Sequence, residues 1–221
     1  MTPDLFDSTP PDMPACQRLA PGALLLRQFA REHDAQQHSG YLFTFKTVTR
    51  SAPLRHQLTP GGHMMSVAMT SCGDLGWVSS KSGYCYSPAD PQSGMPWPAI
   101  PQTWRAMAVL AARRAGYSSF NPDACLINEY APGAKMGLHQ DRDEQDLSQP
   151  IVSVSLGLPA VFLFGAGKRT DKPQRIGLTD GDVVVWGGPA RLAFHGVAPL
   201  ADGEHPVWGA RRINLTFRRA R

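Results

Sequence analysis

Residues 137–144, which read GLHQDRDE, place a histidine and two aspartates at alternate positions: His139, Asp141 and Asp143. On a β-strand, alternate side chains lie on the same face of the sheet. An imidazole and a carboxylate two residues apart can therefore bind one metal ion together. Because a lone His-x-Asp sequence arises easily by chance, this spacing alone is weak evidence for a metal site.

His195 is the best candidate for a third metal ligand. It stands within LAFHGV, residues 192–197, which has the composition of a strand. Two histidines and one carboxylate form the ligand set of non-haem Fe(II) oxygenases, which keep coordination positions open for other ligands. A single histidine on a strand is more often a hydrogen-bonded core residue. The evidence for a metal site therefore depends on the residues that surround these three.

The last apolar segment, RRINLTFR at residues 211–218, carries two arginines and an amide on one face: Arg212, Asn214 and Arg218. The residues between them supply an apolar opposite face. Two guanidinium groups directed into a protein interior cost too much free energy without an anionic partner. Since guanidinium matches carboxylate in a bidentate pair, this face predicts a carboxylate ligand. The alternative is an edge strand that turns these side chains toward solvent.

Length and composition describe one large domain or at most two small ones, with 221 residues, 42% hydrophobic and 18% charged. The chain has no apolar run of the roughly 18 residues that a membrane span needs and no signal-like N-terminus, so we expect a cytoplasmic monomer. Four scattered cysteines argue against a zinc site or a disulfide framework. A net charge of +4 is compatible with a polyanionic partner but too small to demonstrate one.

Short strands between turns are expected from residue 123 onward, and eight of them at roughly regular spacing favour a sandwich or a barrel such as a double-sheet jelly roll. These segments are 124–130, 135–141, 151–157, 160–165, 175–179, 182–188, 192–197 and 211–218. We therefore expect a mainly β protein with flanking α-helices.

The N-terminal half has a different texture, with a proline-rich start and a long loop rich in Gly, Pro, Ser and aromatics. We expect a flexible leader over residues 1–20, a strand at 23–29, a helix within 30–50, a turn and strand at 59–69, a functional loop at 72–101 and a helix at 102–115. One domain is expected over 21–221, with an N-terminal extension and lid at about 21–122 and a β core at about 123–218.

The His-x-Asp pair, the later histidine and the Arg-x-Asn-x-x-x-Arg strand together resemble the Fe(II)/2-oxoglutarate dioxygenases of the AlkB family. The resemblance covers residues 58–218 and includes TPGG, PDACLIN, PIVSVSLGLPA and GDVVVWGG, whereas residues 1–57 resemble the family only loosely. It implies a double-stranded β-helix, a jelly-roll or cupin-like core, under a helical and loop-rich substrate-recognition lid.

By this resemblance, His139, Asp141 and His195 bind Fe(II), with 2-oxoglutarate and O2 as cosubstrates. The 2-oxoglutarate pocket is implied to consist of Asn128, Tyr130, Arg212, Asn214 and Arg218. The family often has a basic residue where this chain has Glu129. Because that residue lies on the other face of its strand, we expect little effect on the cosubstrate site.

The aromatic loop supplies the implied substrate side, since an enzyme that acts on a base must extrude it and hold it between flat surfaces. The resemblance places Trp77 on the base opposite His139, and places Tyr84 and Tyr86 at substrate phosphate or base. An aromatic face also attracts a base that methylation has made cationic. The alternative is that these rings simply pack the lid.

Asp143 and Arg169 complete the implied substrate site. A carboxylate beside the metal can accept a hydrogen bond from the exocyclic amine of adenine or cytosine, and the resemblance gives that role to Asp143. It places Arg169 on the substrate side, although a Lys168–Arg169 pair is more often a solvated hairpin tip. Glu144 has no expected role.

The implied activity is oxidative demethylation of 1-methyladenine and 3-methylcytosine, with release of formaldehyde, succinate and CO2. The implied partner is alkylated DNA, single-stranded by preference, with RNA as a further substrate. Two alternatives stay open. One is the same chemistry on tRNA or on a substrate other than nucleic acid. The other is a non-catalytic nucleic-acid-binding module, against which the complete set of ligands and arginines argues.

Overall fold

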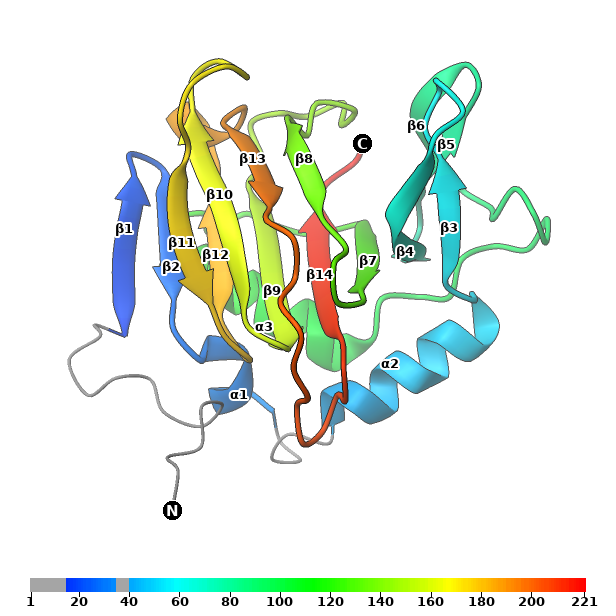
Figure 1. Cartoon of the computed structure of the whole chain (residues 1–221), viewed down its shortest axis with the longest axis horizontal. Helices are drawn as coiled ribbons and strands as arrows, with labels where there is room; N and C mark the ends of the chain where they lie inside the picture. Colours follow the sequence, from blue (N-terminus) through cyan, green and yellow to red (C-terminus); the bar gives the residue numbers. More distant parts are fainter. Residues whose placement is uncertain (1–14, 35–39) are drawn as a thin grey trace.

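The computed structural model describes residues 15–34 and 40–221 (Figure 1). The helices of this part are α1 (Phe29–Glu32), α2 (Gly40–Ser51) and α3 (Gln102–Arg114), with a 3-10 turn η1 (Gly188–Ala190). The N-terminal strands are β1 (Cys16–Ala20), β2 (Ala23–Leu26), β3 (Arg55–Leu58), β4 (Met64–Gly73), β5 (Gly76–Ser80) and β6 (Gly83–Ser87). The C-terminal strands are β7 (Ala124–Tyr130), β8 (Met136–His139), β9 (Ile151–Gly157), β10 (Ala160–Ala166), β11 (Gln174–Leu178), β12 (Val183–Trp186), β13 (Phe194–Val197) and β14 (Arg212–Arg218).

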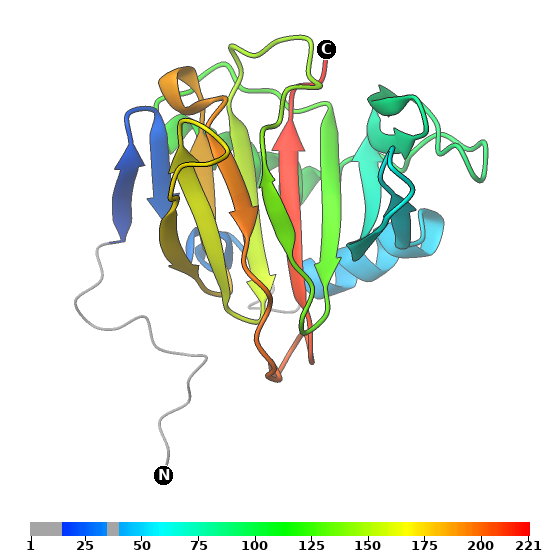
Figure 2. The same cartoon turned by 45° about the horizontal axis from the view of Figure 1, so that its top comes forward.

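Two antiparallel sheets pack face to face and form the jelly-roll core that the sequence predicts. The major sheet has the order β1-β2-β12-β9-β14-β7-β4-β3, and the minor sheet has the order β11-β10-β13-β8. Figure 2 shows the minor sheet in front of the centre of the major sheet. The crossovers between the sheets bring β8 and β13 opposite β14, which places the three predicted ligands and the two predicted arginines in one interior.

Strand β14 occupies the middle of the major sheet, and every one of its seven residues is buried. Its apolar face, Ile213, Leu215 and Phe217, joins a core that includes Trp104 and Met107 of α3. Burial of each such side chain stabilises the fold by about 1.5–3 kcal/mol. Its polar face is left for the interior between the sheets, as the alternation of the sequence predicts.

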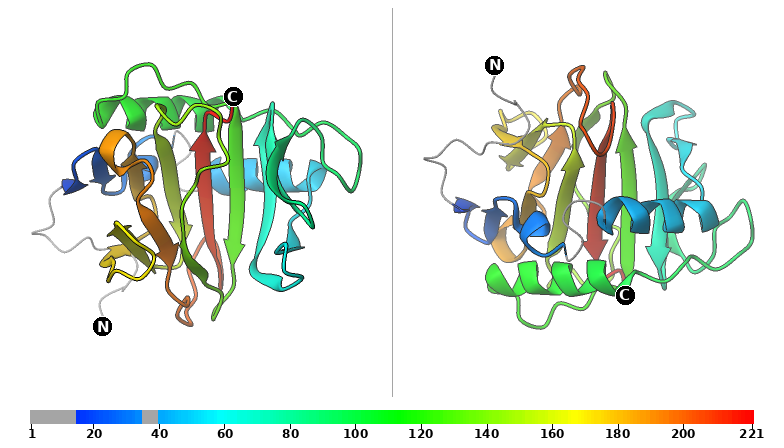
Figure 3. Two further views of the ribbon diagram at one scale, coloured as in Figure 1. Left: turned by 90° about the horizontal axis from the view of Figure 1, so that it is seen from above. Right: turned by 90° about the horizontal axis from the view of Figure 1, so that it is seen from below.

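Helices α2 and α3 both cover the outer face of the major sheet, away from the minor sheet (Figure 3). In α3 the buried residues Trp104, Met107, Ala108 and Ala111 follow helical spacing. The helix stops before Gly116, which has a positive φ of 93° and supplies the left-handed residue that commonly ends a helix. The helix predicted at 102–115 is therefore confirmed, with its last helical residue at Arg114.

The loop expected at 72–101 contains a hairpin of β5 and β6, which we call the lid hairpin. Its base is packed on Trp97, whose indole N–H donates to the Ser87 carbonyl at 2.9 Å. A Cβ on Gly76 would come within 2.3 Å of the Trp97 ring, so the close approach of strand and indole requires glycine there. Side chains of the lid hairpin therefore have a defined place beside the core.

Three N-terminal expectations need correction within the described residues. The flexible leader predicted over 1–20 is wrong for Cys16–Ala20, which form β1 and pair with β2; residues 1–14 lie outside the described residues. The strand predicted at 23–29 ends at Leu26, since Gln28 adopts a left-handed φ of 51° before α1. The helix expected in 30–50 is α2, which runs to Ser51, while residues 35–39 are not described.

All four cysteines are free, in agreement with the absence of a disulfide pattern in the sequence. In the described residues no helix is long and apolar enough to cross a membrane.

Candidate metal centre and active-site pocket

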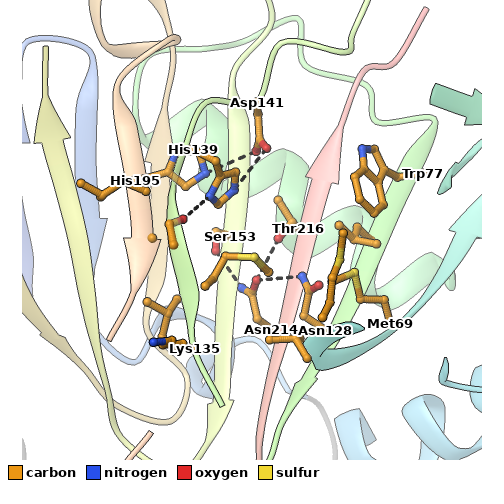
Figure 4. Close-up of a pocket in the computed structure, with 18 of the residues that line it drawn as sticks. Met69, Trp77, Asn128, Lys135, His139, Asp141, Ser153, His195, Asn214 and Thr216 are labelled. Atoms are coloured by element: carbon orange, nitrogen blue, oxygen red, sulfur yellow. Dashed lines mark hydrogen bonds and ion pairs between the residues drawn. The ribbon is translucent and has the colours of Figure 1, made fainter. Parts of the chain in front are cut away.

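His139 and His195 lie side by side on adjacent strands of the minor sheet, where they are direct partners in the pairing of β8 with β13. Their ring centroids lie 4.3 Å apart. Asp141 completes the group: its Oδ1 lies 3.7 Å from His139 Nε2, and its Oδ2 lies 3.5 Å from His195 Nε2. One ligand atom from each residue falls within 4.8 Å of the others. Figure 4 shows the three side chains pointing toward a common point.

Asp141 reaches this position in a different way from the one that the alternation predicts. Strand β8 ends at His139, so Asp141 and Asp143 lie in the following loop instead of on the strand. Two arginines distant in sequence hold Asp141 in place. Arg218 Nη2 donates to its Oδ2 at 2.6 Å, and Arg191 Nη1 donates to its backbone carbonyl at 2.7 Å.

Both histidines are oriented for metal binding by their own backbone surroundings. The Nδ1 of His139 lies 2.9 Å from the Gly137 carbonyl, and the Nδ1 of His195 lies 3.1 Å from the Ala193 carbonyl. A carbonyl can only accept, so Nδ1 carries the proton and the Nε2 lone pair is left toward Asp141. This is the tautomer that a metal ligand needs.

Electrostatics also favour the deprotonated forms of His139 and Asp141. Burial and the neighbouring His195 imidazole lower the pKa of His139. Burial alone would raise the pKa of Asp141, but the adjacent Arg218 guanidinium and His195 bring that pKa well below its ordinary value. A carboxylate and neutral imidazoles are the forms that coordinate a divalent metal.

The three side chains open into a pocket of about 370 Å³ between the sheets. Twelve of the thirteen residues that the sequence and the resemblance assign to a site line it: Trp77, Tyr84, Asn128, Tyr130, His139, Asp141, Asp143, Arg169, His195, Arg212, Asn214 and Arg218. Tyr86 is the exception. Its hydroxyl is turned behind the pocket wall and donates to Glu144 Oε1 at 2.7 Å.

Arg212 has the environment of an anion-binding residue. It is only 2% exposed, and its guanidinium lies over the Tyr130 ring at 4.9 Å. Nη2 donates to Ser155 Oγ at 2.7 Å, but Nε and Nη1 have no hydrogen-bond partner among the described residues. Burial lowers the pKa of Arg212. A buried guanidinium with two unused donors fits a carboxylate ligand such as 2-oxoglutarate.

A hydrogen-bonded network of small polar groups forms the floor beside Arg212. Asn214 Nδ2 donates to Ser153 Oγ at 2.8 Å, and its Oδ1 accepts from Thr216 at 3.0 Å. Asn128 Nδ2 donates to the same Oδ1 at 3.3 Å, while Asn128 Oδ1 is buried without a partner among the described residues. The network fixes both amides at the pocket surface (Figure 4).

The lid hairpin supplies the opposite wall. Trp77 on β5 and Tyr84 on β6 stack with ring centroids 4.9 Å apart, and Trp77 Nε1 donates to Asp143 Oδ2 at 3.0 Å. Figure 4 places Trp77 across the pocket from the histidines. An aromatic face therefore lies opposite the candidate metal centre, with a carboxylate at its edge.

Sequence reasoning missed two residues that hold this site together. Glu144 is buried and bonded to Tyr86, Arg191 and Arg218, although it had no expected role. Arg191 was not singled out because it follows a Gly-Pro-Ala turn and belongs to no alternating pattern. Its one signal was a lone arginine in the otherwise apolar PARLAFHGV that carries His195.

The jelly-roll core and its His-Asp-His centre define a known class of protein. A family model described as the 2OG-Fe(II) oxygenase superfamily matches residues 22–218. The chain belongs to that superfamily. It is accordingly a dioxygenase that depends on Fe(II), 2-oxoglutarate and O2.

Individual relatives narrow the class further. The chain is 54% identical to the alpha-ketoglutarate-dependent dioxygenase AlkB of Escherichia coli, over 98% of this chain and 97% of that protein. It is 53% identical to AlkB of Salmonella typhimurium over the same shares of the two chains. A solved structure of OsALKBH1 superposes with a TM-score of 0.80 at 29% identity and covers 92% of this chain and 99% of that one. The predicted resemblance to the AlkB family is confirmed.

Proposed function

We propose that the protein removes N-methyl groups from alkylated nucleobases, with 1-methyladenine and 3-methylcytosine in single-stranded DNA as preferred substrates and RNA as a further one. The observation that carries this proposal is the pairing of Trp77 with Asp143 opposite the metal centre in one pocket. A planar ring and a carboxylate at its edge suit a flat, cationic base with an exocyclic amine.

His139, Asp141 and His195 are the proposed ligands of Fe(II). When bound, the iron supplies oxidation of the substrate methyl group at the expense of O2 and 2-oxoglutarate. The residues themselves direct their ligand atoms toward one point. Because three side chains of the described part of the chain form this group, coordination positions would remain for cosubstrates. The hydroxylated methyl group is then released as formaldehyde, with succinate and CO2 as the other products.

Arg212 is proposed to bind the carboxylate of 2-oxoglutarate that lies farther from the metal. Its free Nε and Nη1 donors supply the recognition, and Tyr130, Asn128 and Asn214 shape the pocket around it. Arg218 holds Asp141 and lines the same pocket near the metal, which suits contact with the keto acid end. The buried setting excludes water from both ends of the cosubstrate.

The substrate base is proposed to lie between Trp77 and His139, with Asp143 at its amine. Tyr84, which is 41% exposed, and Arg169 are proposed to contact the sugar-phosphate backbone. Tyr86 does not line the pocket; its hydroxyl donates to Glu144 and accepts from the guanidinium of Arg218, which does line it. We propose a cytoplasmic location and, because every proposed site residue comes from this chain, a monomer. The proposed single catalytic domain extends the expected range of 21–221 to include β1, which pairs with β2 in the major sheet.

Two more distant relatives support a nucleobase substrate through their own functions. A DNA N(6)-methyladenine demethylase of Arabidopsis thaliana is 39% identical over 44% of this chain. A tRNA demethylase of Schizosaccharomyces pombe is 33% identical over 45% of it. The second of these keeps tRNA as an alternative substrate for the same chemistry.

The test is incubation with Fe(II), ascorbate, 2-oxoglutarate and oligonucleotides that carry 1-methyladenine or 3-methylcytosine, followed by mass spectrometry. We expect loss of the methyl group from single-stranded DNA, a slower loss from RNA of the same sequence, and none with Asp141→Ala. Turnover of 2-oxoglutarate without demethylation of any oligonucleotide would contradict a nucleobase substrate.

A matched pair of variants tests the base-reading role. Asp143→Asn should alter the preference between the two methylated bases, whereas Asp146→Asn should not. Asp146 is an acid of the same loop whose carboxylate accepts hydrogen bonds from the backbone N–H and the hydroxyl of Ser148, and it does not line the pocket. An equal effect of both variants would assign the change to the loop in general.

A further inference from the structure

Glu144 is a buried carboxylate that contacts three separate elements. Its side chain is 1% exposed. Oε2 lies 2.9 Å from Arg191 Nη2, and Oε1 lies 3.3 Å from Arg218 Nε. Oε1 also accepts the hydroxyl hydrogen of Tyr86 at 2.7 Å. A carboxylate so deeply buried is stable only when its oxygens are engaged in this way.

The Arg191 guanidinium donates hydrogen bonds into one segment, residues 141–149. Besides Glu144, it donates from Nη1 to the Asp141 carbonyl at 2.7 Å and from Nε to the Gln149 carbonyl at 2.9 Å. Arg191 itself follows η1 and is 3% exposed. Because the planar guanidinium bonds to three acceptors of this segment at once, it fixes the path of the loop from residue 141 to residue 149.

Arg218 holds the same loop from the opposite side. It comes from the end of β14 and donates to Asp141 Oδ2 at 2.6 Å, while its Nε lies 3.3 Å from Glu144 Oε1 in an ion pair without a hydrogen bond. The two acids and the two arginines balance one another in charge. The loop that carries Asp141 is therefore held between two guanidinium groups, one on its backbone and one on its side chain, with Glu144 bridging them.

We propose that Arg191 is a positioning residue for the metal ligand Asp141, that it acts together with Glu144, and that Tyr86 joins the lid hairpin to the same cluster. This inference rests on the proposed function, because it takes Asp141 as a ligand of Fe(II). Without Arg191, the loop loses the bond to the Asp141 carbonyl, and Glu144 keeps only one guanidinium partner. The Asp141 carboxylate is then less well fixed and also occupies positions from which it would not bind the metal.

The consequence is measurable as metal affinity, since loss of an outer partner of a ligand usually weakens metal binding about 10–100-fold. The probe is Mn(II), with the free ion counted by electron paramagnetic resonance in titrations of the full chain. Arg191→Gln should weaken Mn(II) binding at least about 10-fold, and Arg191→Lys less, because an ammonium reaches fewer of the three acceptors. Half-saturation of activity by Fe(II) should rise in parallel, while kcat at saturating Fe(II) recovers.

Arg27→Gln is the matched control for loss of a buried arginine. Arg27 is 9% exposed and pairs with Asp182 at 2.7 Å, and neither residue lines the pocket. We expect this variant to lower the Tm and to leave Mn(II) affinity unchanged. Equal weakening of Mn(II) binding in Arg27→Gln and Arg191→Gln would overturn the proposal, since general loosening of the fold would then explain both.

Glu144→Gln keeps the inference testable if Arg191→Gln does not fold, because the amide preserves volume while it removes the charge. The proposal would be overturned if a folded Arg191→Gln variant bound Mn(II) with wild-type affinity. If only Glu144→Gln folds, wild-type Mn(II) affinity in that variant would overturn it. Asp141→Asn separates this result from the proposed function. If Asp141→Asn binds Mn(II) as well as the wild type, the ligand assignment itself fails; if it does not, only the role of Arg191 is in question.

Discussion

The two ends of β14 each carry a buried arginine that faces the pocket, yet the two are surrounded by opposite chemistry. At the C-terminal end, Arg218 contacts Asp141 at 2.6 Å and Glu144 at 3.3 Å. At the N-terminal end, Arg212 contacts an aromatic ring and a serine hydroxyl. Among the described residues no acid forms an ion pair with Arg212, and two of its nitrogens have no hydrogen-bond partner.

This difference separates an arginine that organises the protein from one that is left for a ligand. The protein itself supplies the counter-charges of Arg218, so that residue stabilises the loop that carries Asp141 in the absence of cosubstrate. Arg212 has no such counter-charge, and an anion that enters the pocket recovers the free energy lost on its burial. The same alternation of sequence therefore serves two purposes along one strand.

Asp143 is the acidic counterpart of Arg212. It lines the pocket, and its partner is the neutral indole N–H of Trp77 at 3.0 Å. No arginine or lysine among the described residues forms an ion pair with it. Asp143 without an ion-pair partner suits the proposed cationic base, and Arg212 without one suits the anionic keto acid that we propose it binds.

The largest expected effect is a loss of folding stability when Arg218, at the C-terminal end of β14, is replaced. Arg218→Met leaves Asp141 and Glu144 buried without their shared guanidinium, which should lower the free energy of unfolding by about 3–5 kcal/mol. Urea denaturation of the metal-free protein measures this. A loss below about 1 kcal/mol would show that the two ends of β14 do not differ as described.

Arg212→Met is the corresponding change at the N-terminal end of β14, and it should weaken the binding of 2-oxoglutarate. Because the native guanidinium has no acid partner to lose, stability should change by less than about 1 kcal/mol. The half-saturating 2-oxoglutarate concentration should rise about 100-fold, since two charge-assisted hydrogen bonds are lost. An unchanged 2-oxoglutarate requirement in steady-state assays would remove the assignment of Arg212.

Trp77→Phe tests the substrate side with a smaller change. The ring face is retained, but the hydrogen bond to Asp143 is lost, so the carboxylate is less well oriented toward the base. KM for a methylated oligonucleotide should rise about 3–10-fold, with 2-oxoglutarate binding unaffected. A parallel rise in the 2-oxoglutarate requirement would show that the lid hairpin also shapes the cosubstrate end.

The salt bridge between the partly exposed Arg55 on β3 and the buried Asp90 gives the smallest expected effect. Burial alone would raise the pKa of Asp90, but hydrogen bonds from Arg55, the Gln92 backbone and Ser93 lower it below 3.8. A depressed carboxyl pKa stabilises the fold above pH 3.8, and this stability is lost as the pH falls through the pKa of the folded state. Asp90→Asn should therefore cost about 1 kcal/mol or less at pH 7, and the difference from wild type should vanish on acidification in urea denaturation experiments.

Much of the fold could be predicted from the sequence because its signals are local. The eight C-terminal segments were apolar runs between turns, and each corresponds to a strand from β7 to β14. The spacing of Trp104, Met107 and Ala111 was enough for α3. The N-terminal part was predicted less well, because β1 gains its stability from pairing with β2, not from its own residues.

The sequence by itself determined the ligand types and the two faces of β14, since side-chain alternation is a property of the strand alone. Only the tertiary structure decided which charges meet. Asp141 lies beyond the end of β8 and is placed by Arg218, 77 residues away in sequence. Glu144 is joined to Arg191 across 47 residues, and Tyr86 turns away from the pocket toward them. No local period encodes such partners, because they depend on how the two sheets bring distant strand ends together.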